Sequence, residues 1–160
     1  MKHLAGALAF ALLAWTASAQ TVPHGSRQPI PPEVSALAAK AGLDAPVSAW
    51  CRVLFQAGRP RAYAVAITSA DRGGRYLVVE SNAAAVELAP FRETPDLACY
   101  TPAQAKALNR TIEVSETIQG RVTPRWSTTV VCGFVDETTS VCWQYSPPDR
   151  AFVKVGGWST

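Results

Sequence analysis

Side chains suited to nucleophilic or acid–base catalysis are scarce in this sequence. It contains two histidines, His3 in an apolar leader and His24 in a proline-rich stretch. Serine and cysteine hydrolases need an imidazole held rigidly beside the nucleophile, which a histidine near a chain end rarely provides. Glycine-rich phosphate loops, Gly-x-Ser-x-Gly turns and calcium-binding loops are absent from the sequence. We therefore expect no cofactor, no histidine-rich metal site and no histidine-dependent catalysis.

Paired carboxylates are the remaining route to hydrolysis. Glycosidases hold two acids about 5–9 Å apart across a cleft, and Glu113 and Glu116 are the best candidates by spacing. The alternation of residues 111–119 predicts a strand, on which residues three apart point to opposite faces. Asp136 and Glu137 are typical of a solvated hairpin turn. A hydrolase that uses a carboxylate pair is kept as an alternative function.

The four cysteines favour disulfides over a zinc site. Zinc sites use close ligand pairs with about two to four residues between them, whereas nine residues separate even the closest pair here, Cys132 and Cys142. An even number of cysteines in an exported chain is typical of a disulfide framework. Three pairings are possible. We expect Cys132 to pair with Cys142 across a hairpin, which leaves Cys51 with Cys99.

Four arginines flank the first two predicted strand breaks: Arg59, Arg61, Arg72 and Arg75. If they converge at one end of the sheet, they form a rim that recognises a small anionic ligand or a partner protein, because guanidinium groups bind anions through paired hydrogen bonds. The alternative is that they are surface residues with no specific role.

The charge of the chain argues against nucleic acid as a partner. Its 15 basic and 12 acidic residues give a net charge of +3, and removal of Lys2 with a leader would leave +2 (3 − 1). Nucleic-acid binding requires a strongly basic surface interleaved with aromatic side chains. Tyr63 and Tyr76, next to the arginines, occupy strand positions that are expected to face the core.

Large aromatic residues are numerous for a chain of this length. Trp50, Trp126, Trp143 and Trp158, together with Tyr145, either fill the core or line a surface for a ligand. Trp158 follows two glycines near the end of the chain and is the one most expected to be exposed.

The first residues predict export. Lys2 precedes an apolar run over 4–15, and Ala17-Ser18-Ala19 matches the small-x-small pattern that signal peptidase cuts. The run is shorter than the roughly 20 residues of a membrane-spanning helix. We therefore expect a signal peptide over 1–19, a periplasmic or secreted protein, and no transmembrane segment after cleavage. Three prolines predict an extended arm over 20–31, followed by a single domain over 32–160.

Hydrophobic periodicity predicts short helices and alternating strands. Thr101, Pro102 and Gln104 have the spacing of a capping box, which starts the second helix. Residues 85–91 are ambiguous, but Pro90 favours a short strand over a helix. The expected helices cover 32–41 and 102–109; the expected strands cover 48–55, 62–68, 75–80, 111–119, 127–135, 139–145 and 151–155.

These elements predict an α+β fold, rich in β-structure, with one mainly antiparallel sheet of about seven strands, two short helices and two disulfides. The sequence motif Asn109-Arg110-Thr111 also matches the pattern for N-glycosylation. The function we expect is a small exported module that binds an envelope protein or a small anionic ligand without catalysis. A structural protein of the cell envelope is the third possibility.

Overall fold

The computed structural model describes residues 29–55, 61–82, 84–92, 95–113 and 117–160, without the side chains of 111–113. The predicted signal peptide, most of the predicted arm, and Arg59 lie outside the described residues. The elements are α1 (Pro32–Lys40), β1 (Val47–Val53), β2 (Ala62–Ser69), β3 (Gly73–Glu80), β4 (Val86–Phe91), β5 (Leu97–Tyr100), α2 (Pro102–Glu113), β6 (Gln119–Val122), β7 (Val130–Phe134), β8 (Thr139–Ser146) and β9 (Ala151–Ser159).

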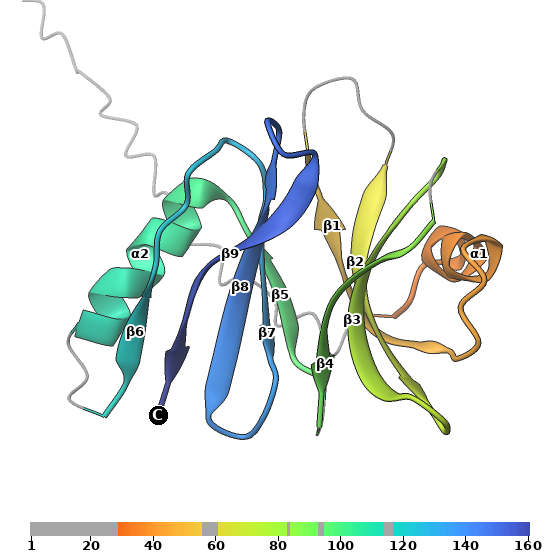
Figure 1. Ribbon diagram of the computed structural model, residues 1–160, viewed down its shortest axis with the longest axis horizontal. Helices are drawn as coiled ribbons and strands as arrows, with labels where there is room; N and C mark the ends of the chain where they lie inside the picture. Colours follow the sequence, from red (N-terminus) through yellow and green to blue (C-terminus); the bar gives the residue numbers. More distant parts are fainter. Residues whose placement is uncertain (1–28, 56–60, 83, 93–94, 114–116) are drawn as a thin grey trace, which may run out of the picture.

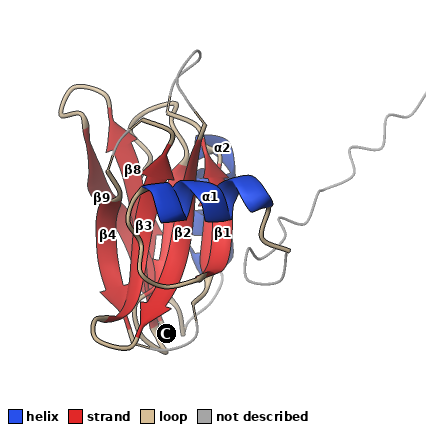
Figure 2. Ribbon diagram, turned by 90° about the vertical axis from the view of Figure 1, so that its right-hand side faces the viewer, coloured by secondary structure: helices blue, strands red, loops and turns tan. Residues whose placement is uncertain are grey.

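Two antiparallel sheets replace the single sheet that the sequence predicts. Sheet A has the strand order β1-β2-β3-β4, and sheet B has the order β5-β7-β8-β9-β6. The described part of the chain thus contains nine strands and two helices. The predicted fold class, α+β and rich in β-structure, is confirmed. Figure 1 shows four layers in the order α2, sheet B, sheet A and α1. In Figure 2, α1 lies across the strands of sheet A, with α2 behind both sheets.

The burial of β2 and β3 on both faces explains the second sheet. Six of the eight residues in each strand form an unbroken buried run, which requires cover on both sides. The outer face of sheet A packs against Val34 and Ala38 of α1. Its inner face packs against sheet B. In β2 the alanines Ala62, Ala64 and Ala66 face sheet B, and the larger Tyr63, Val65 and Ile67 face α1.

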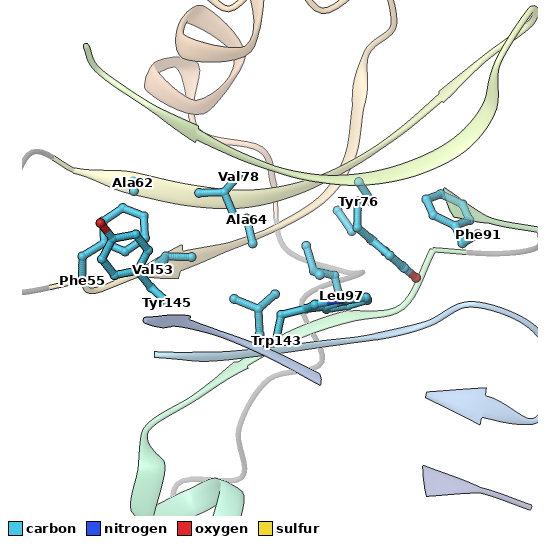
Figure 3. Packing of buried hydrophobic residues seen from close by; sticks show 13 residues of the cluster. Val53, Phe55, Ala62, Ala64, Tyr76, Val78, Phe91, Leu97, Trp143 and Tyr145 are labelled. Carbon is cyan, nitrogen blue, oxygen red and sulfur yellow. The ribbon is translucent and has the colours of Figure 1, made fainter. Parts of the chain in front are cut away.

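The inner core contains aromatic and aliphatic side chains from both sheets, as Figure 3 shows. The small alanines of β2 leave room for large neighbours. Tyr76 of β3 reaches from sheet A toward sheet B beside Phe91, with ring centroids 4.6 Å apart. Trp143 of β8 lies below Val78 and Ala64 in the same layer.

Residues 111–113 end a helix, and the prediction of a strand over 111–119 is wrong. Helix α2 begins with the predicted capping box: Gln104 N–H donates to Thr101 Oγ1 (3.3 Å), and Thr101 N–H donates to Gln104 Oε1 (2.8 Å). The helix continues to Glu113, beyond the predicted end at residue 109. Asn109, buried in α2, bonds both the N–H and the carbonyl of Val122 in β6 through its amide. This contact holds the helix against the edge of sheet B.

The other predicted elements are found with small changes of length. Residues 86–91 form strand β4, as Pro90 favours. The last strand is longer than expected, because β9 continues through Gly156 and Gly157 and pairs with β6. A Cβ atom at Gly156 would lie 2.0 Å from the Arg121 carbonyl oxygen, so only glycine allows this close approach.

Both disulfides have the predicted pairing. Cys132 and Cys142 link β7 to β8, and Cys51 and Cys99 link β1 of sheet A to β5 of sheet B. Among the described residues, no helix has the length and apolar character needed to cross a bilayer.

Candidate binding cleft between the sheets

One side of the sandwich is tied across the two sheets. The Cys51–Cys99 disulfide joins β1 to β5. Near the end of β1, Leu54 N–H donates to Thr129 Oγ1 (2.8 Å), and Thr129 N–H donates to the Leu54 carbonyl (2.9 Å). The sheets therefore lie close together along β1 and β5, and we call this the tied side.

Tyr76 ties the sheets at one end of the core. Its buried hydroxyl donates to the Phe134 carbonyl (2.8 Å) and accepts from Asp96 N–H (3.3 Å). Burial raises the pKa of Tyr76 from its ordinary value of 10.0 to about 12, with a smaller contribution from the charge of Asp96. Beside it, Arg92 N–H donates to the Val135 carbonyl (3.2 Å), so this end of the core is closed.

The opposite side of the sandwich holds a cleft. It has a volume of about 620 Å³ and lies between β3 and β4 on one wall and β8 and β9 on the other. Pockets for small molecules commonly measure about 300–1,000 Å³. Its lining combines apolar side chains with two acids and two bases: Phe55, Val78, Glu80, Val86, Glu87, Leu88, Trp143, Tyr145, Arg150, Ala151, Phe152 and Lys154. We call this the inter-sheet cleft.

The floor of the inter-sheet cleft is a cluster of aromatic rings. The centroids of Phe55 and Tyr145 are 4.7 Å apart, and Phe152 lies 5.5 Å from Phe55 and 5.6 Å from Tyr145. Phe55 and Tyr145 are side by side in Figure 3. Ring clusters of this kind supply a large apolar contact area with little rotamer freedom. The floor is therefore a rigid apolar platform.

Strand β9 carries a cation on its inner face, beside a β-bulge. Cys142 pairs with Gly156, and Trp143 pairs with Lys154, so Val155 is the extra residue. Val155 is buried under α2, while Lys154 lies opposite Trp143 on the face toward sheet A. Lys154 shares this face with Phe152, because the side chains alternate regularly between the two residues.

A second bulge, in β4, arranges the facing wall. Tyr76 pairs with Ala89, and Leu77 pairs with Glu87, so Leu88 is the extra residue. Beyond the bulge, Val86 pairs with Val78 on the inner face, where its side chain is 43% exposed in the inter-sheet cleft. Glu87 is turned to the outer face, and its carboxylate lies 3.7 Å from Arg75 Nη1.

Three other charged groups border the inter-sheet cleft. Glu80, half-buried, shares the inner face of β3 with Val78. Lys154 and Arg150 belong to the opposite wall and are exposed. None of the three side chains forms a salt bridge or hydrogen bond with another residue in the described part of the chain. The walls therefore differ in charge, with an acid on sheet A and two bases on sheet B.

The turn between β8 and β9 fixes Arg150. Ser146 Oγ donates to the Asp149 carboxylate, and Asp149 N–H donates back to Ser146 Oγ (3.3 Å). Arg150 follows with φ of 52°, in the left-handed region that side chains other than glycine rarely adopt. Such conformations are concentrated at functional sites, where the surrounding structure holds them.

The structure does not bring together the arginines that the sequence singled out. Arg61 precedes β2 and Arg72 follows it, so the two exposed residues lie at opposite ends of an eight-residue strand. Arg75 is buried on the outer face of sheet A, with Nη2 3.3 Å from Asp44 Oδ1. Arg59 lies outside the described residues.

The other candidate residues also lie away from the inter-sheet cleft. Glu116 and the Glu113 side chain are outside the described part of the chain. Asp136 closes the β7–β8 turn, where hydrogen bonds from the backbone of Thr138 and from Thr139 lower its pKa. Asn109 of the glycosylation motif is buried and hydrogen-bonded, so the folded domain does not present it to a transferase.

The aromatic residues divide between core and cleft. Trp143 and Tyr145 are buried and also form part of the cleft lining. They therefore both fill the core and line a surface that a ligand can reach. Trp158 is half-buried against Phe134, with ring centroids 6.3 Å apart. The two bulges, which lie close to Lys154 and Val86 of the inter-sheet cleft, were missed because nothing in a strand's alternation marks an inserted residue.

No family model, curated protein or solved structure matches this chain. Among the described residues, no group of three or more histidine, cysteine or acidic side chains has an arrangement that could hold a metal ion. The interpretation of the inter-sheet cleft therefore rests on its geometry.

Proposed function

We propose that the protein is a small exported binding module that holds an amphipathic ligand in the inter-sheet cleft without catalysis. The observation that carries the proposal is the aromatic floor formed by Phe55, Tyr145 and Phe152 within an open cleft of about 620 Å³. Binding sites for small molecules are concave and mainly apolar, with a few polar groups that fix orientation. Of the twelve residues that line the inter-sheet cleft, eight are apolar or aromatic and four are charged.

The polar groups favour binding over hydrolysis. A carboxylate-pair hydrolase needs two acids that act on the same bond. Glu80 and Glu87 both border the inter-sheet cleft, but Glu87 is ion-paired with Arg75 on the outer face. This leaves Glu80 as a single acid, which is suited to orienting a ligand.

Export is supported by two independent features. The leader over 1–19 has the charged start, apolar run and small-residue pattern of a signal peptide. The two disulfides join the sheets and cross-link a hairpin, and disulfides of this kind persist in oxidising compartments. The periplasm or the extracellular space is therefore the proposed location.

The proposal is tested with an aromatic amphiphile, 1-anilinonaphthalene-8-sulfonate, whose fluorescence rises in apolar surroundings. Replacing Phe152 by alanine removes a ring from the floor and is expected to weaken probe binding about tenfold, the equivalent of about 1.4 kcal/mol. Phe134→Ala is the matched control, because Phe134 is also half-buried but lies outside the cleft lining. Equal affinities for the two variants and the native protein would contradict the proposal.

A further inference from the structure

We propose that the ligand of the inter-sheet cleft is a zwitterion with a large apolar side chain, of the chemical class of a short peptide with free termini. This inference rests on the proposed function and specifies its ligand. In the proposed arrangement the ammonium group faces Glu80, the carboxylate faces Lys154 and Arg150, and the apolar side chain lies on the aromatic floor.

The acidic wall supports the position of the ammonium group. Glu80 is the last residue of β3 and has the same strand parity as Val78 and Tyr76, both of which are buried in the inner core. It pairs in register with Ala62, whose small side chain leaves the space beside the carboxylate open. A half-buried carboxylate without a partner is costly, and a ligand cation lowers that cost.

The basic wall supports the position of the carboxylate. Lys154 lies directly opposite Trp143 in the β8–β9 pairing and on the same strand face as Phe152, toward the inter-sheet cleft. Arg150 borders the same space from a turn braced by Ser146 and Asp149. Strand β9 and the turn before it therefore bring two cations to one wall.

Separation of the charges on two walls distinguishes a zwitterion from a simple anion. An anionic amphiphile would satisfy Lys154 and Arg150 but would bring its charge close to Glu80. A ligand with both charges, separated by a short backbone, matches both walls at once.

The edge of β4 favours recognition through side chains rather than addition of a strand. Pro90 lies on this edge and has no N–H to donate, and the bulge at Leu88 interrupts the ladder. Both features hinder an incoming strand from pairing with an exposed edge. The ligand is therefore held between the walls and not as a fifth strand of sheet A.

The test is calorimetric titration with three forms of one dipeptide, L-Phe-L-Leu: the free zwitterion, its N-acetyl form and its C-terminal amide. The free dipeptide is expected to bind the native protein at least fivefold more tightly than either blocked form. Glu80→Gln should remove the preference over the N-acetyl form, because that preference depends on the ammonium group. Lys154→Gln should reduce the preference over the amide.

Glu137→Gln and Lys106→Gln are the matched controls, because both residues are exposed and neither belongs to the cleft lining. They should leave all three affinities unchanged. If the N-acetyl form binds as tightly as the free dipeptide, the proposal of a zwitterionic ligand is overturned. The inter-sheet cleft then remains the proposed site, but for anions. If Phe152→Ala also fails to weaken binding of 1-anilinonaphthalene-8-sulfonate, the proposed function fails as well. The blocked forms test the native protein, so the result does not depend on how the variants fold.

Discussion

The tied side and the open side of the sandwich are built from the same two sheets but differ in their cross-links. On the tied side, a disulfide and two hydrogen bonds between Leu54 and Thr129 join the β1 segment to sheet B. On the open side, β3 and β4 face β8 and β9 across the inter-sheet cleft. The difference indicates that fixing one side of a two-sheet domain allows the other side to remain apart. The binding site is then built mainly from the inner faces of strands, together with Phe55 beyond β1 and Arg150 in the β8–β9 turn.

The strands also differ in how regularly they pair. The β2–β3 pairing runs without interruption over eight residue pairs. The β1–β2 pairing on the tied side shifts register between Val47 and Ala49. The β3–β4 and β8–β9 pairings, which form the walls of the inter-sheet cleft, each contain a bulge. Irregular pairing therefore occurs on both sides of the sandwich.

The largest expected effect comes from cutting the tied side. Replacing Cys51 and Cys99 by alanine should lower the free energy of unfolding by about 4 kcal/mol, because this disulfide closes a loop with a sequence separation of 48. Replacing Cys132 and Cys142, with a separation of 10, should cost about 3 kcal/mol. Urea unfolding of the two double variants measures both values. A larger loss for the hairpin disulfide would contradict this ranking.

Tyr76→Phe tests the second tie between the sheets. The variant leaves the Phe134 carbonyl and the Asp96 N–H without their partner, so unfolding should become easier by about 2 kcal/mol. Tyr63→Phe is the control, because Tyr63 lies on the outer face of sheet A. The two variants are compared by their urea midpoints. Equal stability of both would show that the Tyr76 hydroxyl does not tie the sheets.

The same tyrosine predicts a loss of stability at alkaline pH. Its pKa is about 12 in the folded protein and near 10.0 in the unfolded chain, so the folded state resists ionisation. The contribution is fully present below pH 10 and is lost as the pH rises to 12, for a total of about 2–3 kcal/mol. Chemical unfolding between pH 9 and 12 measures this decline. In the Tyr76→Phe variant the free energy of unfolding should fall less over this pH range. An unchanged fall would contradict the assignment of the decline to Tyr76.

The smallest expected effect concerns the turn on the open side. Arg150→Gly relieves a left-handed backbone and should raise the free energy of unfolding by about 1 kcal/mol. The same variant should weaken binding of L-Phe-L-Leu about threefold, because one cation is lost. Gly73→Ala, at a φ of 68° with no atoms within 4 Å of the added Cβ, should instead destabilise by about 1 kcal/mol. Effects of the same sign for the two variants would contradict this account of the turn.

The β2–β3 turn, the start of α2 and the disulfide pairing were largely predictable from the sequence, because their signals are local. Asp71-Arg72-Gly73-Gly74 marks the β2–β3 turn, and Thr101 with Gln104 marks the start of α2. The disulfide pairing followed from the short hairpin that contains Cys132 and Cys142. Each of these features depends on residues that are close in sequence.

The length of α2 and the two bulges were not predictable, because they depend on register and on partners far away in the chain. Residues 111–119 alternate as a strand does, yet Ala105, Leu108 and Ile112 have the spacing of a helix. The hydrogen bonds from Asn109 to Val122, a residue of a later strand, stabilise the helix. The bulges at Leu88 and Val155 likewise become apparent only when the partner strands are in place.

The most direct test of the account is to locate a bound amphiphile by NMR with methyl-labelled valine and leucine. We expect contacts between the aromatic protons of 1-anilinonaphthalene-8-sulfonate and the methyl groups of Val78 and Leu88, which line the inter-sheet cleft. Val65 under α1 and Val130 under α2 should show none. Contacts to Val65 or Val130 in place of Val78 and Leu88, or no contacts at saturating probe, would contradict the assignment of the inter-sheet cleft as the binding site.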